Sequence, residues 1–99
     1  MPVKQLVRYK GGARDQMLRL AAIGKECNER HGAISFVFTQ IYTGEHSGQW
    51  QAEMLFADWE SFGRVQKGLA GDTAFLTASA EVGKITVFQE RTMVTVFDL

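Results

Sequence analysis

Four stretches of the chain are rich in β-branched and aromatic residues, and several alternate apolar with polar positions at a period of two. This pattern is typical of β-strands. The predicted strands span residues 3–9, 33–42, 49–56 and 85–97. The last is long for one strand, and the polar run Gln89, Glu90 and Arg91 at its middle predicts a bulge or bend.

Between these strands, apolar and small residues recur at a spacing of three and four, which predicts helices with one buried face. Gly32 stands where a helix C-terminal glycine is expected, and Asp58 and Asp72 are suitable N-caps for two further helices. Gly83 is expected to end the last helix. The predicted helices span residues 13–31, 58–69 and 73–82.

The resulting order is β-α-β-β-α-β, with the second helical region split in two. Each βαβ half crosses over with a right hand, which produces a four-stranded antiparallel sheet with all helices on one side. We therefore expect an α+β fold of the ferredoxin-like type, formed by residues 1–99 as one domain.

Two of the predicted strands are apolar on both faces, although helices can cover only one face of the sheet. Exposed apolar sheet loses about 25 cal/mol per Å² and favours association. A second copy packed sheet against sheet is the simplest cover, so we expect a homodimer; the alternative is a twisted monomer with scattered apolar residues. The opposed sets are Ile34, Phe36, Phe38 and Tyr42 against Ala33, Val37 and Ile41, and Phe88, Val94 and Val96 against Val87, Met93 and Phe97.

The second half of the chain resembles the dimeric α+β barrel superfamily, which includes antibiotic-biosynthesis-type monooxygenases and NIPSNAP-like domains. The resemblance starts at the glycine-containing hairpin GEHSGQW and continues through an aromatic strand. Asp58 and Trp59 then open one helix, and Gly71, Asp72 and Phe75 open a short extra one. With the preceding elements it covers nearly the whole chain, and it is specific for fold rather than for activity.

The resemblance implies a cavity that accommodates aromatic substrates, with Trp59 at the position of a tryptophan often involved in them. The haem-degrading branch uses a histidine on the second helical segment, and residues 58–82 contain none, which argues against haem degradation. The expected function is a small-molecule enzyme or binder, with cofactor-independent monooxygenation as the candidate reaction and no cofactor. The alternative is a non-catalytic dimeric domain for stress response or partner interaction.

The aromatic residues predict an apolar pocket between sheet and helices, although they could equally fill a small core. The candidate polar groups for catalysis are Tyr42, His46 and Arg91, chosen by residue type and predicted position. The candidate pocket residues are Phe36, Phe38, Trp50, Met54, Trp59, Phe62 and Phe75.

Composition narrows the function classes. The chain has 99 residues, with 11 Lys and Arg balanced by 11 Asp and Glu, and a basic first half followed by an acidic second half. A neutral chain is a poor general nucleic-acid binder, and the strand around Trp50 lacks the basic neighbours of an RNA-recognition domain. No apolar run approaches the about 20 residues of a membrane span. The N-terminus has no signal-peptide pattern, so we expect a cytoplasmic protein.

Two further motifs have structural explanations that we prefer. Cys27 and His31, four residues apart on one helix, could form a reactive thiolate pair or half of a zinc site. Cys27 lies on the apolar face, however, and His31 complements the helix dipole, so no metal site is expected. The pair Gly11 and Gly12 could bind an anion, but a strand-to-helix turn explains it equally well.

Overall fold

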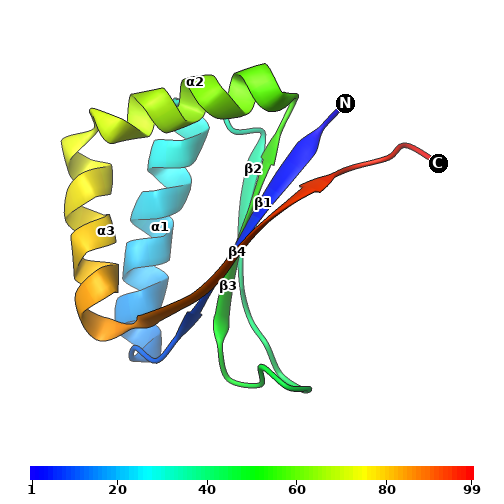
Figure 1. Cartoon of the computed structure of the whole chain (residues 1–99). Helices are drawn as coiled ribbons and strands as arrows, with labels where there is room; N and C mark the ends of the chain where they lie inside the picture. Colours follow the sequence, from blue (N-terminus) through cyan, green and yellow to red (C-terminus); the bar gives the residue numbers. More distant parts are fainter.

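The computed structural model describes residues 1–99 and contains four strands and three helices (Figure 1). In chain order they are β1 (Val3–Lys10), α1 (Arg14–Arg30), β2 (Ser35–Gln40), β3 (Trp50–Phe56), α2 (Trp59–Ala70), α3 (Thr73–Ile85) and β4 (Val87–Thr95). The predicted order of elements is confirmed, including the split second helical region.

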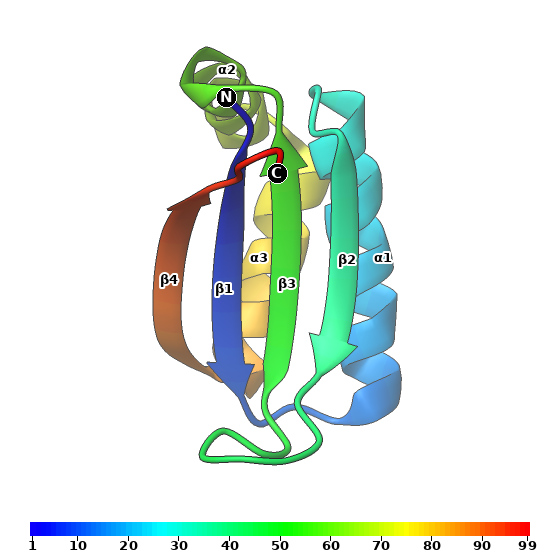
Figure 2. The same ribbon diagram turned by 90° about the vertical axis from the view of Figure 1, so that its right-hand side faces the viewer.

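The strands form one sheet in the order β2-β3-β1-β4, and every neighbouring pair is antiparallel (Figure 2). The two strands of each βαβ half are thus not adjacent to each other, as the ferredoxin-like fold requires. The predicted fold class is confirmed.

All three helices lie on one side of the sheet. Helices α1 and α3 run side by side along it, whereas α2 crosses one end of the layer (Figure 1). The core lies between the layers, where Val3 and Phe56 of the sheet and Val65 of α2 are almost fully buried. No helix covers the opposite face of the sheet (Figure 2).

The two predicted N-caps are confirmed. The Asp58 carboxylate accepts a hydrogen bond from the backbone N–H of Ser61 at 2.7 Å, and this bond lowers the pKa of Asp58. The Asp72 carboxylate accepts from the N–H groups of Ala74 and Phe75 at 3.1 and 3.3 Å. These side chains fix where α2 and α3 begin.

Some predicted boundaries are wrong by a few residues. Helix α3 continues through Gly83 to Ile85, because this glycine keeps helical backbone angles instead of the left-handed conformation of a helix end. Strand β2 ends at Gln40, so Tyr42 belongs to the loop between β2 and β3.

The predicted bulge in the last strand is confirmed. Arg8 pairs with Glu90 while the next residue, Tyr9, pairs with Phe88, which leaves Gln89 as an extra residue in β4. The extra residue turns Phe88 to the helix-facing side, where it packs edge-on against Tyr9. The sequence pattern grouped Phe88 with Val94, and this grouping is wrong because the bulge shifts the alternation.

None of the helices combines the length and the hydropathy that crossing a bilayer requires.

Candidate functional site

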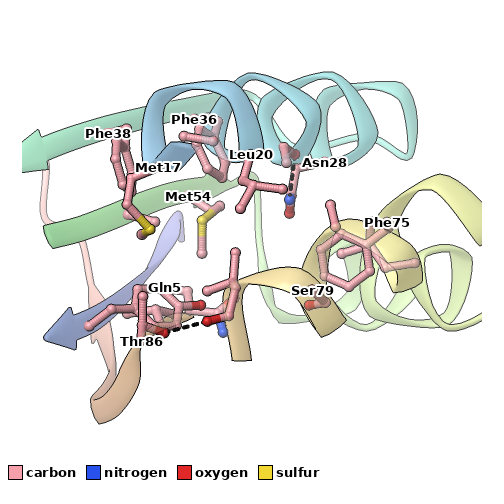
Figure 3. Close-up of a pocket in the computed structure, with 18 of the residues that line it drawn as sticks. Gln5, Met17, Leu20, Asn28, Phe36, Phe38, Met54, Phe75, Ser79 and Thr86 are labelled. Carbon is pink, nitrogen blue, oxygen red and sulfur yellow. Dashed lines mark hydrogen bonds between the residues drawn. The ribbon is translucent and has the colours of Figure 1, made fainter. Parts of the chain in front are cut away.

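A cavity of about 340 Å³ lies between the helix layer and the sheet (Figure 3). Every strand and every helix contributes to its wall. The lining residues are Gln5, Val7, Tyr9, Met17, Leu20, Ala21, Gly24, Asn28, Phe36, Phe38, Ala52, Met54, Gln66, Leu69, Phe75, Ala78, Ser79, Val82, Gly83, Thr86 and Phe88.

The cavity reaches the surface between α3 and β4. Among its lining residues only Ser79 and Gly83 of α3 and Phe88 of β4 are exposed, whereas the others are buried or half-buried. Phe88 is 58% exposed at this mouth. A ligand would therefore enter past α3 and the Phe88 ring.

Four of the sequence-predicted pocket residues line this cavity. Phe36 and Phe38 reach it from β2, Met54 from β3 and Phe75 from α3 (Figure 3). Alternation places the first three on the helix-facing side of adjacent strands, since Phe36 pairs with Met54 and Phe38 with Ala52. They form an aromatic and thioether wall.

The other predicted pocket residues, Trp50, Trp59 and Phe62, lie outside the lining. The Trp50 ring is buried and stacks on Phe38 at 5.5 Å, so it packs beside this wall on the same face of the sheet. Trp59 is 56% exposed and contacts Phe62, whose ring packs edge-on against Phe56 at 5.2 Å. Helix α2 crosses the end of the layer (Figure 1), and the only residues of this helix that line the cavity are Gln66 and Leu69, which lie beyond its first turn.

The three candidate catalytic residues do not converge on the cavity. Tyr42 is 90% exposed in the loop between β2 and β3, and His46 lies in the same loop, 4.0 Å from Glu45. Arg91 lies on β4, with its guanidinium 5.6 Å from the centre of the Phe62 ring. None of the three lines the cavity.

The polar lining of the cavity was not predicted from the sequence. Gln5, Asn28 and Gln66 reach it from β1, α1 and α2, and Tyr9, Ser79 and Thr86 add hydroxyl groups. The available signal was the presence of amides at positions whose spacing assigns them to apolar faces. A polar residue at a core-facing position needs a partner, which a ligand can supply.

The lining carries no Asp, Glu, Lys, Arg or His. Its only titratable side chain is Tyr9, and burial raises the pKa of this phenol. The hydroxyl of Thr86 donates to the carbonyl of Val82 at 2.7 Å and is already satisfied. The cavity is thus an electrically neutral compartment with apolar walls and a few amide and hydroxyl groups.

In the Cys27 and His31 motif, Cys27 is a buried residue of α1 and His31 joins this helix to another. Cys27 is buried, and this burial, reinforced by the negative charge of Asp72, raises the pKa of its thiol. His31 Nε2 lies 2.7 Å from Asp72 Oδ2, and Arg30 donates to the same oxygen. The end of α1 is thereby joined to the start of α3. No three His, Cys, Asp or Glu residues gather in a way that could hold a metal ion.

The glycine pair forms the turn from β1 to α1. Gly11 and Gly12 have φ angles of +91° and +88°, in the region that favours glycine. A Cβ atom on Gly12 would also lie 2.7 Å from Met17 Sδ. Backbone conformation and close packing therefore account for both glycines.

Comparison with known proteins identifies solved structures that share this fold. No protein-family model and no curated protein matches the sequence. Among solved structures, a mutant of SnoaB, a cofactor-independent oxygenase from Streptomyces nogalater, superposes with a TM-score of 0.77 at 15% identity, covering 99% of this chain and 95% of that one. Rv0793 from Mycobacterium tuberculosis gives 0.73 at 16% identity, with coverage of 100% and 98%.

A NIPSNAP family protein from Agrobacterium tumefaciens gives a TM-score of 0.70 at 14% identity, covering 94% of this chain and 86% of that one. The chain therefore has the fold of the antibiotic-biosynthesis monooxygenase-like and NIPSNAP proteins, as its sequence pattern predicted. Identities this low establish the fold alone, so the reaction has to be argued from the cavity.

Proposed function

We propose that this protein binds a small aromatic molecule in the cavity and oxygenates it without a cofactor. The observation that supports the proposal is the cavity itself, whose volume of about 340 Å³ falls in the range of small-molecule sites. Its aromatic walls match a flat ring system, and SnoaB, which shares the fold, is a cofactor-independent oxygenase.

In such a reaction the substrate supplies the electrons. Conversion of a ring CH₂ group to a carbonyl by one O₂ releases one water, so that atoms and electrons balance without a further reductant. The walls would hold the ring in one orientation and exclude bulk water, while the amides contact its oxygen substituents.

Oxygen consumption with a panel of ring ketones and phenols tests this function. The matched variants are Ala21→Leu, which adds a larger side chain to the cavity lining, and Ala22→Leu on the exposed face of the same helix. We expect Ala21→Leu to abolish turnover and Ala22→Leu to retain it. Equal turnover in both variants would place the chemistry elsewhere.

A non-catalytic binding domain is the competing function, and the neutral lining favours it, because no carboxylate or imidazole faces the cavity to act as a general base. Product analysis separates the two. Saturable binding of an aromatic ligand with no O₂ consumption and no product would indicate a binding domain.

We further propose that the bare face of the sheet binds a second copy of the chain. Alternation places Leu6, Val37, Leu55 and Val94 on this face, and Val37 is 48% exposed in the single chain. The chain beyond β4 also crosses in front of this face (Figure 2). Covering these side chains removes apolar area from water, which favours association.

Light scattering at micromolar concentration tests the dimer. Val37→Lys is expected to shift the mass toward the monomer, while Leu76→Lys on α3, where the side chain is 49% exposed, leaves the mass unchanged. A monomeric mass for the unaltered chain would refute the assembly.

A further inference from the structure

Two side chains of opposite charge, Lys4 of β1 and Glu53 of β3, lie on the face of the sheet that no helix covers. Each is half-buried in the single chain. Each also lies between apolar side chains of the two neighbouring strands, so a partner that covers these apolar side chains covers both charges as well. The flanking residues are Leu55 and Val94 for Lys4, and Leu6 and Val37 for Glu53.

The chain itself supplies neither charge with a counter-charge. Arg8, which is also half-buried on this face, lies 2.7 Å from the carboxylate of Glu90 and donates a hydrogen bond to Gln49 at 2.9 Å. Lys4 and Glu53, by contrast, take part in no ion pair. Covering a charge that has no partner costs far more than covering one that is already paired. Whatever covers this face must therefore bring a carboxylate to Lys4 and a cation to Glu53.

The positions of the two charges are self-complementary. Lys4 pairs with Leu55, two residues beyond Glu53 on β3, so Lys4 and Glu53 are diagonal neighbours on adjacent strands. In a two-fold dimer, a contact from Lys4 to the partner's Glu53 implies the same contact from Glu53 to the partner's Lys4. A two-fold axis that runs between the two side chains, parallel to the sheet, brings each charge over its opposite. A second copy of the chain thus supplies both missing counter-charges at once.

We infer that Lys4 and Glu53 select a second copy of this chain as the partner of the sheet face, through two reciprocal ion pairs between the chains. The inference rests on the dimer proposed above, and it specifies the residues that determine the partner and the register of the two sheets. Chains of the same fold without this arrangement would leave both charges buried and unpaired, which excludes them as partners.

Reversal of either charge tests the ion pairs. Lys4→Glu sets two carboxylates against each other twice in the dimer, and Glu53→Lys does the same with two cations. Because like charges in a buried interface repel strongly, we expect each variant to raise the Kd of the dimer at least about 100-fold. Sedimentation velocity over a series of concentrations measures this Kd, and circular dichroism checks that each variant keeps its fold.

A mixture of the two variants separates pairing between chains from pairing within one chain. In a heterodimer of Lys4→Glu with Glu53→Lys, every contact between the chains again joins opposite charges, whereas each chain by itself carries two like charges. We expect the mixture to dimerise with a Kd within about 10-fold of that of the unaltered chain. Native mass spectrometry, with one variant isotope-labelled, identifies the heterodimer. The double variant Lys4→Glu/Glu53→Lys is expected to form a homodimer for the same reason.

The controls separate these contacts from general attraction between chains of opposite net charge. Lys67→Glu and Glu60→Lys make the same changes in net charge at exposed positions of α2. We expect each control to keep the Kd of the unaltered chain, alone and in their mixture. Asp98→Asn removes a carboxylate from the chain end that crosses in front of the sheet face (Figure 2), and it is also expected to leave the Kd unchanged.

The outcomes distinguish this inference from the proposed dimer. If Lys4→Glu and Glu53→Lys dimerise as tightly as the unaltered chain, the ion pairs are wrong and the dimer stands. Rescue in the double variant without rescue in the mixture would mean that the two charges pair within one chain, and loss of the dimer in Asp98→Asn would give Lys4 another counter-charge. Either result would overturn the inference. A monomeric unaltered chain would overturn the inference and the dimer together.

Discussion

The two interior glycines of α2, Gly63 and Gly68, provide a matched pair for testing how this helix is seated. A Cβ atom on Gly63 would meet nothing within 4 Å. A Cβ atom on Gly68 would lie 2.4 Å from Nδ1 of the His31 ring, which is held from its other side by Asp72. The same substitution to alanine therefore probes open solvent at one position and the junction with α1 at the other.

The two substitutions are expected to change the free energy of unfolding in opposite directions. In a helix interior, alanine is more stable than glycine by about 0.5–1 kcal/mol, so Gly63→Ala is expected to stabilise the chain by that amount. At Gly68 the same gain is opposed by inserting a methyl group into occupied space, which costs about 1–3 kcal/mol. Gly68→Ala is therefore expected to be less stable than Gly63→Ala by about 1–3 kcal/mol.

Urea unfolding followed by the fluorescence of the buried Trp50 measures both variants. In a domain of this size, the gain for Gly63→Ala corresponds to a rise of about 2–8 °C in melting temperature. The substitution His31→Ala makes room for the methyl group of Gly68→Ala. In a chain that already carries His31→Ala, we therefore expect Gly68→Ala to stabilise the fold. Equal stabilisation by Gly63→Ala and Gly68→Ala would refute the packing of α2 against α1 described above.

Three other measurements check different parts of the structure. Hydrogen bonds from Arg30 and His31 hold the pKa of Asp72 well below its ordinary value. The stability advantage of the unaltered chain over Asp72→Asn is therefore expected to be complete above about pH 4 and to shrink as the pH falls further. A difference in the free energy of unfolding that stays constant between neutral and strongly acidic pH in urea titrations would contradict this. The buried Cys27 thiol, whose pKa is raised, should react with a disulfide reagent slowly in the native protein and rapidly in urea, and rapid native labelling would place it at the surface. Phe88→Ala should speed the entry of an aromatic probe such as methyl naphthyl ketone in stopped-flow mixing, with little change in stability because the Phe88 ring is largely exposed. An unchanged rate would put the entrance elsewhere.

Local sequence signals predicted the order and type of the elements because the causes of these signals are local. Asp58 and Asp72 cap helices through N–H groups within three residues of themselves, and an aspartate followed by a helical pattern shows this directly. The polar run around Gln89 likewise predicted the bulge that the strand pairing shows. Both signals can be recognised without knowledge of the rest of the chain.

The candidate site was harder to predict because its wall is assembled from every element. Phe36 and Phe38 were predicted as members of the aromatic set, and alternation along β2 does place the two on one face. Trp59 was misplaced, since nothing in its neighbourhood indicates that α2 crosses the end of the layer instead of lying along it.

The sequence by itself determined the order of elements, the caps and the ferredoxin-like fold, since these follow from periodicity and from contacts a few residues apart. Only the tertiary structure decided that Phe88 faces the helices, that the Nε2 atom of Gln66 is buried without a partner, and that the space between the layers is a neutral cavity. These properties depend on how separate segments pack against one another, and packing across long sequence distances leaves no periodic pattern in any one segment.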